Sequence, residues 1–139
     1  MRGSILLVDD EERILKTLSR ALKDEGHDVF VTSSATRARE LLSERSFDVL
    51  IVDNRMPQVS GLELIRDLAR SAPETDRPEV LMMTAHATVE SAIEAMKLGA
   101  FDYLQKPFDV EELLVVVGKA LSHRRLRSEH RYLLSERKT

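Results

Sequence analysis

Short apolar runs rich in β-branched residues alternate with helix-like patterns along almost the whole chain, and this alternation constrains the fold most strongly. The runs cover residues 4–8, 28–32, 49–52, 80–83 and 101–104, and each precedes a segment with apolar residues at helical spacing. Strands that alternate with helices are typical of βαβ units and a parallel sheet. The sequence therefore predicts an α/β fold, a doubly wound (βα)5 sandwich with helices on both faces of the sheet.

Periodicity also predicts which side chains the helices bury. In the fourth helix, expected over about 88–98, Val89, Ile93 and Met96 recur at helical spacing, and we expect them to face the core. Gly26 and Gly99 follow the last periodic residues of the first and fourth helices, where glycine commonly ends a helix. Residues 49–52 are apolar without alternation, which predicts a central strand buried on both faces.

Length and composition indicate one domain with a short appendage. The chain has 139 residues, of which 42% are hydrophobic and 32% charged, and this is enough to bury a core of its own. No apolar stretch approaches the ~18 residues that a membrane span needs, and the first residues lack a signal-peptide pattern. Without cysteines there are no disulfides or zinc–thiolate sites, which fits a cytoplasmic protein.

The net charge of −3 divides into an acidic body and a basic tail. Residues 122–139 carry six Lys/Arg against two Glu, whereas residues 1–121 carry 15 Lys/Arg against 22 Asp/Glu. Phosphate-backbone binding needs surplus Lys and Arg, so we expect no direct nucleic-acid binding. We predict a domain over residues 1–121 and a basic helical extension over 122–139. Leu126 and Leu133, with His130 between them, leave a solvated helix and a dimerising helix both open.

Polar residues suited to metal and phosphate chemistry follow four of the five predicted strands. Asp9 and Asp10 follow the first, Asp53 the third, Thr84 the fourth and Lys106 the fifth. Taken singly, each has an ordinary explanation, such as a helix cap or a solvated charge. In open α/β folds, however, the carboxyl ends of the strands form the ligand site. Because clustered carboxylates repel one another without a cation, the joint placement predicts bound Mg²⁺ (or Mn²⁺) and an anion for the lysine.

These segments resemble the receiver domain of two-component response regulators over residues 4–121, most closely in nitrogen-regulation-type (NtrC-like) activators. The matching stretches are Leu6-Leu7-Val8-Asp9-Asp10-Glu11, Val52-Asp53-Asn54-Arg55-Met56-Pro57, Met83-Thr84-Ala85 and Leu104-Gln105-Lys106-Pro107-Phe108. The resemblance implies a flavodoxin-like sheet with strand order 2-1-3-4-5. It also implies a signalling switch and not an enzyme in the usual sense, since a receiver catalyses only its own phosphotransfer and dephosphorylation.

The resemblance further implies how the site works. Asp53 would accept a phosphoryl group from a sensor histidine kinase. Asp9, Asp10, Asp53 and the backbone carbonyl of Arg55 would hold Mg²⁺. Lys106 would pair with the phosphoryl group and precede Pro107 through a cis peptide bond.

A conformational response is implied as well. Thr84 would move toward the phosphoryl group, and Tyr103 would rotate from an exposed to a buried position, the alternative being a half-buried aromatic residue on an edge strand. The face formed by the fourth helix, fifth strand and fifth helix would then change and act on a partner, on an output domain or on a second copy of the chain. The C-terminal helix is an alternative surface for a homodimer.

Residues beside the predicted site suggest further hypotheses. Arg55 and His86 stand two positions after Asp53 and Thr84, near the route of an attacking water. A bulky Arg55 would slow loss of the phosphoryl group, the alternative being a solvated arginine. His86 is either a general base or a solvent-facing loop histidine. Asn54 stands where the family generally has an apolar residue, and its amide either faces solvent or bonds the loop backbone.

Two enzyme classes with this architecture fit less well. A haloacid-dehalogenase-type phosphatase needs a second Asp two residues after its nucleophile, and Arg55 at that position cannot donate a proton. A flavodoxin-like FMN protein needs a Ser/Thr/Gly-rich loop after the first strand, where this chain has Asp9-Asp10-Glu11-Glu12. The basic extension resembles the linker that leads to an ATPase and a DNA-binding domain in transcription activators. A stand-alone phosphorelay receiver is the alternative.

Overall fold

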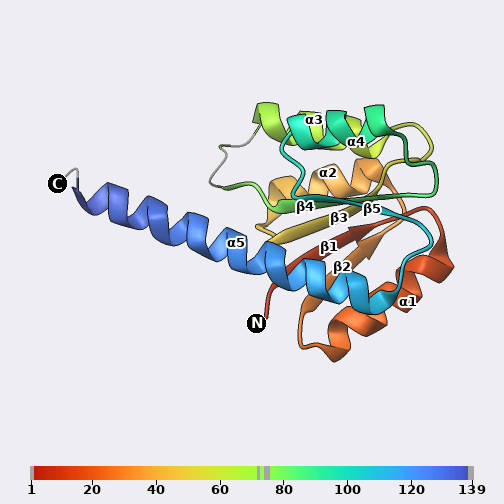
Figure 1. Ribbon diagram of the computed structural model, residues 1–139, viewed down its shortest axis with the longest axis horizontal. Helices are drawn as coiled ribbons and strands as arrows, with labels where there is room; N and C mark the ends of the chain where they lie inside the picture. The colour runs from red at the N-terminus through yellow and green to blue at the C-terminus, as the bar shows by residue number, and fades with distance from the viewer. Residues whose placement is uncertain (1, 72, 74–75, 138–139) are drawn as a thin grey trace.

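The computed structural model describes residues 2–71, 73 and 76–137, with side chains described no further than residue 127, as a three-layer sandwich (Figure 1). The strands are β1 (Ser4–Val8), β2 (Asp28–Thr32), β3 (Val49–Asp53), β4 (Glu79–Thr84) and β5 (Asp102–Gln105). The helices are α1 (Glu12–Asp24), α2 (Ala35–Glu44), α3 (Gly61–Ser71), α4 (Val89–Lys97) and α5 (Val110–Arg137).

The five strands are parallel and lie in the order β2-β1-β3-β4-β5. The predicted fold class and strand order are therefore confirmed. β1 and β3 occupy the middle of the sheet, so their apolar residues are covered on both faces. The order reverses at β1, because β2 lies on one side of it and β3 on the other. Open α/β sheets bind ligands beside such a reversal, at the carboxyl ends of the strands.

Alternate residues of the central strands face two separate cores. On one face, Ile5 and Leu7 of β1 pack with the buried sides of α1 and α5. On the other, Leu6 and Val8 pack with α2, α3 and α4. Figure 1 shows α1 and α5 on one side of the sheet and the other three helices on the opposite side. The missing alternation in residues 49–52 has the same cause, since every residue of β3 is buried.

The predicted helix ends agree with the backbone geometry. Gly26 and Gly99 follow α1 and α4 with φ angles of 92° and 100°, which glycine adopts without steric cost. The side chain of Ser34 caps α2 by accepting a hydrogen bond from the Arg37 N–H. Thr88 and Ser91 form a reciprocal capping box at the start of α4.

The prediction for the buried face of α4 is wrong. Val89, Ile93 and Met96 are 76%, 49% and 49% exposed, and the buried residue of this helix is Ala95. Ala95 packs in the core beneath α4, together with the partly buried Leu98 and Tyr103. A small side chain at the contact lets the helix approach the sheet closely, so the three larger apolar residues are left facing outward.

Helix α5 extends beyond the sheet against which it packs. Among the side chains that the structure describes, the last buried one on this helix is Leu121, whereas the helix continues to Arg137 and projects away from the sheet (Figure 1). Leu126 is 64% exposed. The side chains of His130 and Leu133, which the sequence places on a potential seam, lie outside the described residues. None of the described helices has the length and apolar character required to cross a membrane.

Candidate functional site

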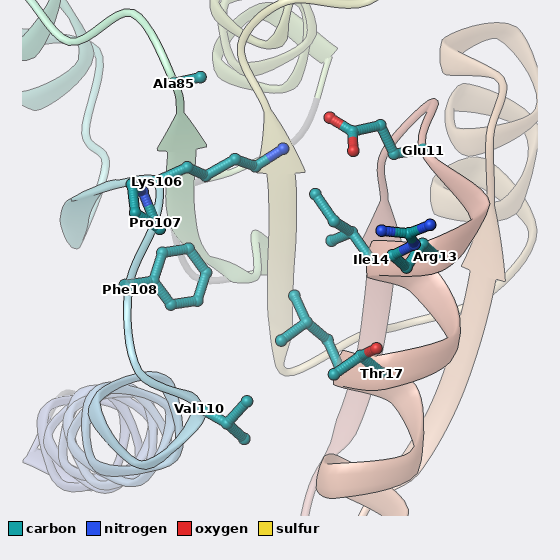
Figure 2. Close-up of a pocket in the computed structure, with 10 residues that line it drawn as sticks. Glu11, Arg13, Ile14, Thr17, Ala85, Lys106, Pro107, Phe108 and Val110 are labelled. Carbon is teal, nitrogen blue, oxygen red and sulfur yellow. The ribbon is translucent and has the colours of Figure 1, made fainter.

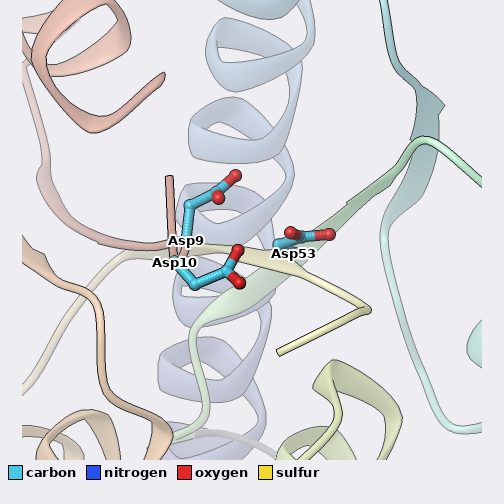
Figure 3. Close-up of side chains that lie close together, drawn as sticks. All are labelled: Asp9, Asp10 and Asp53. Carbon is cyan, nitrogen blue, oxygen red and sulfur yellow. The ribbon is translucent and has the colours of Figure 1, made fainter. Parts of the chain in front are cut away.

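Three predicted carboxylates meet at the carboxyl ends of β1 and β3 (Figure 3). Asp9, Asp10 and Asp53 each contribute an oxygen atom to a group in which all of these atoms lie within 4.8 Å of one another. Asp9 is fully buried and Asp53 is buried, whereas Asp10 is exposed at the rim. The parallel strands therefore bring together carboxylates that are 43 or 44 positions apart in the sequence.

The ammonium group of Lys106, which follows the edge strand β5, also contacts this acidic group. Its Nζ donates a hydrogen bond of 2.7 Å to Asp9 Oδ2 and lies 3.4 Å from Asp53 Oδ2. The Lys106–Pro107 peptide bond is cis, as the resemblance implied. The other oxygen of Asp9 accepts a hydrogen bond from the Glu11 backbone N–H. Lys106 is thus the counter-charge of the site and lies where an anion on Asp53 would meet it.

Burial and neighbouring charge alter the protonation of both groups. Burial raises the pKa of Asp53 above its ordinary value, and the negative charge of Asp9 adds to this, although Lys106 partly opposes the shift. For Lys106, burial alone would lower the pKa, but its bond to Asp9 and the charges of Asp9 and Asp53 outweigh burial and raise it. Lys106 is therefore held firmly in its charged form, whereas Asp53 carries its charge at a cost that a further cation would relieve.

The loop after β3 is fastened directly behind Asp53. A Cβ atom on Gly61 would lie 2.9 Å from the Asp53 carbonyl oxygen and 3.0 Å from Asn54 Cα, so only glycine fits here without a backbone shift. Asn54 Oδ1 accepts a hydrogen bond of 3.2 Å from the Leu62 N–H, which decides between the two alternatives for its amide. The Arg55 N–H donates to Asp53 Oδ1 at 3.2 Å, and the Arg55 side chain is exposed.

Thr84 ends β4 at the same edge of the sheet, two residues before His86. The Thr84 side chain is buried, and its hydroxyl oxygen accepts a hydrogen bond of 3.1 Å from the His86 backbone N–H. The Thr84 carbonyl accepts a bond from the Lys106 N–H, which ties the ends of β4 and β5 together. The His86 side chain is exposed.

Tyr103 is half-buried on the edge strand β5, which agrees with the alternative and differs from the exposed starting position that the resemblance implied. Its ring packs against the core beneath α4, and its hydroxyl group shares a hydrogen bond of 2.7 Å with Ser91 Oγ. Ser91 belongs to the box that caps α4. Sequence reasoning missed Ser91, because a serine in the first turn of a helix has no pattern that reveals a partner on another element.

A mainly apolar pocket of about 420 Å³ opens beside the acidic group (Figure 2). Side chains from the N-cap and first turns of α1 face side chains from the β5–α5 connection and the start of α5 across it. The first set includes Glu11, Ile14 and Thr17, and the second includes Lys106, Phe108 and Val110. One wall of the pocket therefore includes the lysine that contacts Asp9 and Asp53.

Comparison with known proteins agrees with this arrangement. Residues 5–118 match the response regulator receiver domain, and the chain belongs to this family. It is 38% identical over 129 residues to the regulatory protein AtoC of Escherichia coli strain K12, covering 93% of this chain and 27% of AtoC. It is also 38% identical over 122 residues to the DNA-binding transcriptional regulator NtrC of the same strain, covering 88% of this chain and 25% of NtrC.

A solved structure shows the same likeness. The beryllofluoride-activated NtrC4 receiver domain dimer superposes with a TM-score of 0.81 at 32% identity, covering 87% of this chain and 98% of that chain. The predicted family and its NtrC-like subfamily are therefore confirmed. The chain spans about a quarter of the length of the two curated relatives.

Proposed function

We propose that the chain is a phosphorylation-dependent switch in which Asp53 accepts a phosphoryl group from a sensor histidine kinase. The observation that carries this proposal is the meeting of Asp9, Asp10, Asp53 and Lys106 at one edge of the sheet. A carboxylate oxygen of Asp53 attacks phosphorus as the bond to the donor breaks. The leaving group keeps that bonding electron pair, and an acyl phosphate forms on Asp53. Lys106 lies close enough to stabilise the added negative charge.

Asp9, Asp10, Asp53 and the backbone carbonyl of Arg55 would hold Mg²⁺ or Mn²⁺. The donor set fits, because it offers closely spaced carboxylate oxygens, which hard divalent cations prefer. A bound cation would supply positive charge that offsets the repulsion between this acidic group and a phosphoryl donor. The burial and the Asp9 charge that raise the pKa of Asp53 support the same need for a cation.

The conformational response runs through Thr84 and Tyr103. A phosphoryl group on Asp53 offers strong acceptor oxygens, so the Thr84 hydroxyl can donate to it and draw the loop before α4 inward. That loop leads to the cap residues Thr88 and Ser91, and Ser91 holds the Tyr103 hydroxyl. Movement of the loop would therefore disturb the Tyr103–Ser91 bond and reorganise the face formed by α4, β5 and α5.

A protein donor is supported by the pocket in Figure 2. Its apolar walls lie directly beside Lys106, so a partner that carries a phosphorylated histidine would bury apolar surface there while its phosphoryl group reaches Asp53.

The chain is also proposed to be the regulatory part of a longer transcription activator. Its relatives AtoC and NtrC support this, because they extend far beyond the matched region. An ATPase or DNA-binding output domain would then be the partner of the α4–β5–α5 face.

The same face also suits a homodimer. Val89, Ile93 and Met96 form an exposed apolar stripe on α4, and the NtrC4 receiver domain is described as an activated dimer. We expect phosphorylation of the parent chain to raise its mass in solution toward that of a dimer, and Ile93→Asp to prevent the rise without affecting phosphorylation. Light scattering on both samples tests this, and equal masses would remove the stripe from the dimer contact.

Arg55 is proposed to prolong the phosphorylated state. Its side chain is exposed beside the site, where it would obstruct an approaching water molecule. We expect Arg55→Ala to raise the rate of dephosphorylation roughly three- to tenfold, a change of about 1 kcal/mol in the barrier. The control variant Arg70→Ala removes an exposed arginine that lies on α3, and it is expected to leave the rate unchanged. Loss of radiolabelled phosphate over time measures both rates, and identical rates would exclude the obstruction. His86, which is also exposed, is a weaker candidate for the same control of lifetime.

Incubation with Mg²⁺ and acetyl phosphate tests the central proposal. We expect the intact mass of the parent chain to increase by one phosphoryl group, and the mass of Asp53→Asn to stay constant. Chelation of the divalent cation should abolish the increase. A parent chain that gains no phosphoryl group, or an Asp53→Asn variant that gains one at the same rate, would contradict the assignment of Asp53.

A further inference from the structure

A second polar cluster lies at the opposite end of the sheet from the acidic site. It joins the middle of α5 to residues at the starts of β3 and β4. Arg124 donates a hydrogen bond of 3.1 Å from Nε to Asp48 Oδ1 and another of 2.6 Å from Nη1 to the Arg77 carbonyl. Arg127 Nη2 donates to the same carbonyl at 2.8 Å. Two arginines one turn apart on α5 therefore hold one backbone carbonyl of the body.

The buried carboxylate of Glu79 forms the centre of this cluster. Glu79 is 4% exposed, and its Oε1 lies 3.0 Å from Arg127 Nη1 and 3.1 Å from His123 Nδ1. Asp48 has a second role, because its other oxygen accepts a hydrogen bond from the Ser4 N–H at the start of β1. Asp48 and the Arg77 carbonyl are thus the hydrogen-bond acceptors for α5, whereas Glu79 Oε1 makes no hydrogen bond with the described residues and supplies a buried negative charge beside them.

The polar cluster holds α5 to the body just beyond the apolar contacts of this helix. Leu121 is the last core residue among the side chains described for this helix, and the polar contacts of residues 123–127 follow within two turns. Part of the positive charge of the tail is therefore paired with acidic groups of the body. The side chains of Arg124 and Arg127 are only 14% and 24% exposed, which contrasts with the solvated extension that remained open from sequence.

We propose that Arg124 and Arg127 form a clamp that fixes the direction in which α5 leaves the receiver body. The clamp consists of their contacts with Asp48, Glu79 and the Arg77 carbonyl. The segment of α5 past Leu121 would otherwise be held only by its own hydrogen bonds, and it is close to the ~12–15 residues below which an isolated helix is marginal in water, so it would swing or fray. Partly buried ion pairs with the body prevent both, so the extension moves with the receiver as one rigid piece. In a chain that continues, the clamp would set where the next segment lies. The proposal does not depend on the phosphoryl chemistry.

Pulsed electron–electron double resonance, which measures the distance between two spin labels, tests the clamp on the 139-residue chain. The chain has no cysteine, so spin labels can be placed solely at Thr36→Cys, on the exposed side of α2, and at Ser135→Cys, within α5. We expect one narrow distance distribution for the parent. The double variant Arg124→Ala/Arg127→Ala should broaden it about twofold, even though alanine favours the helix more than arginine does.

Two further variants make the outcome unambiguous. Lys119→Ala removes a positive charge from the same helix at an exposed position outside the clamp, and we expect its distribution to stay narrow. Glu79→Gln leaves the helix sequence unchanged and should broaden the distribution, while circular dichroism verifies that the domain remains folded. A distribution that is already broad in the parent, that stays narrow in both clamp variants, or that broadens equally in Lys119→Ala would overturn the proposal.

Discussion

Replacing Lys106 with methionine is expected to lower the free energy of unfolding by about 3 kcal/mol in buffer without divalent cations. The lysine side chain is 12% exposed and supplies the counter-charge for Asp9 and Asp53, which stay buried in the variant. Methionine preserves most of the volume but leaves the acidic group without a cation. The cost comes from unpaired buried charge and not from lost packing, because an ion pair broken on one side leaves its partner desolvated.

Urea unfolding of Lys106→Met with and without Mg²⁺ measures this effect and separates its causes. If uncompensated charge is the cause, saturating Mg²⁺ should recover part of the lost free energy, since a ligand that binds only the folded state stabilises it. Lys119→Met is the matched control, because Lys119 is exposed on α5, and we expect a change within about 0.5 kcal/mol. Equal losses in the two variants, or a loss that Mg²⁺ leaves untouched, would mean that Lys106 does not act as the counter-charge.

Gly61→Ala is expected to destabilise the fold by about 2–3 kcal/mol and to slow phosphorylation of Asp53. The added methyl group would come within 3.0 Å of backbone atoms of Asp53 and Asn54, and within 2.8 Å of Met82 Sδ. The methionine can move aside, but the backbone atoms belong to the end of β3 and the loop that carries the phosphoacceptor. The strain would therefore displace Asp53 relative to Lys106, and the position of reacting groups strongly affects rate.

Gly118→Ala is the control for this prediction, because it adds the same methyl group where nothing lies within 4 Å. Gly118 is within α5, so alanine should stabilise the helix by roughly 0.5–1 kcal/mol and leave phosphorylation unchanged. Thermal unfolding and the acetyl phosphate assay on both variants give the two readouts. The close approach at Gly61 would be refuted if both alanine variants changed stability in the same direction.

The sheet and its ligand edge could be predicted from sequence because both depend on short segments. Each strand is a compact apolar run, and the helix pattern that follows it requires a parallel crossover. Once the strands are parallel, residues just after them must share an edge, so Asp9, Asp53 and Lys106 were predictable neighbours although 97 positions separate the first from the last. The glycines that end α1 and α4 were predictable for the same reason, since a helix end is a local event.

Contacts between elements were decided only by the tertiary structure. The apolar stripe of Val89, Ile93 and Met96 was recognisable, but the side of α4 that meets the sheet was not, and the small Ala95 occupies that side. The clamp is a second example, because Arg124 and Arg127 look like any basic helix until Asp48 and Glu79 are placed beside them. Periodicity and composition belong to one segment, whereas the packing of a helix depends on the shape and charge of a surface assembled from several.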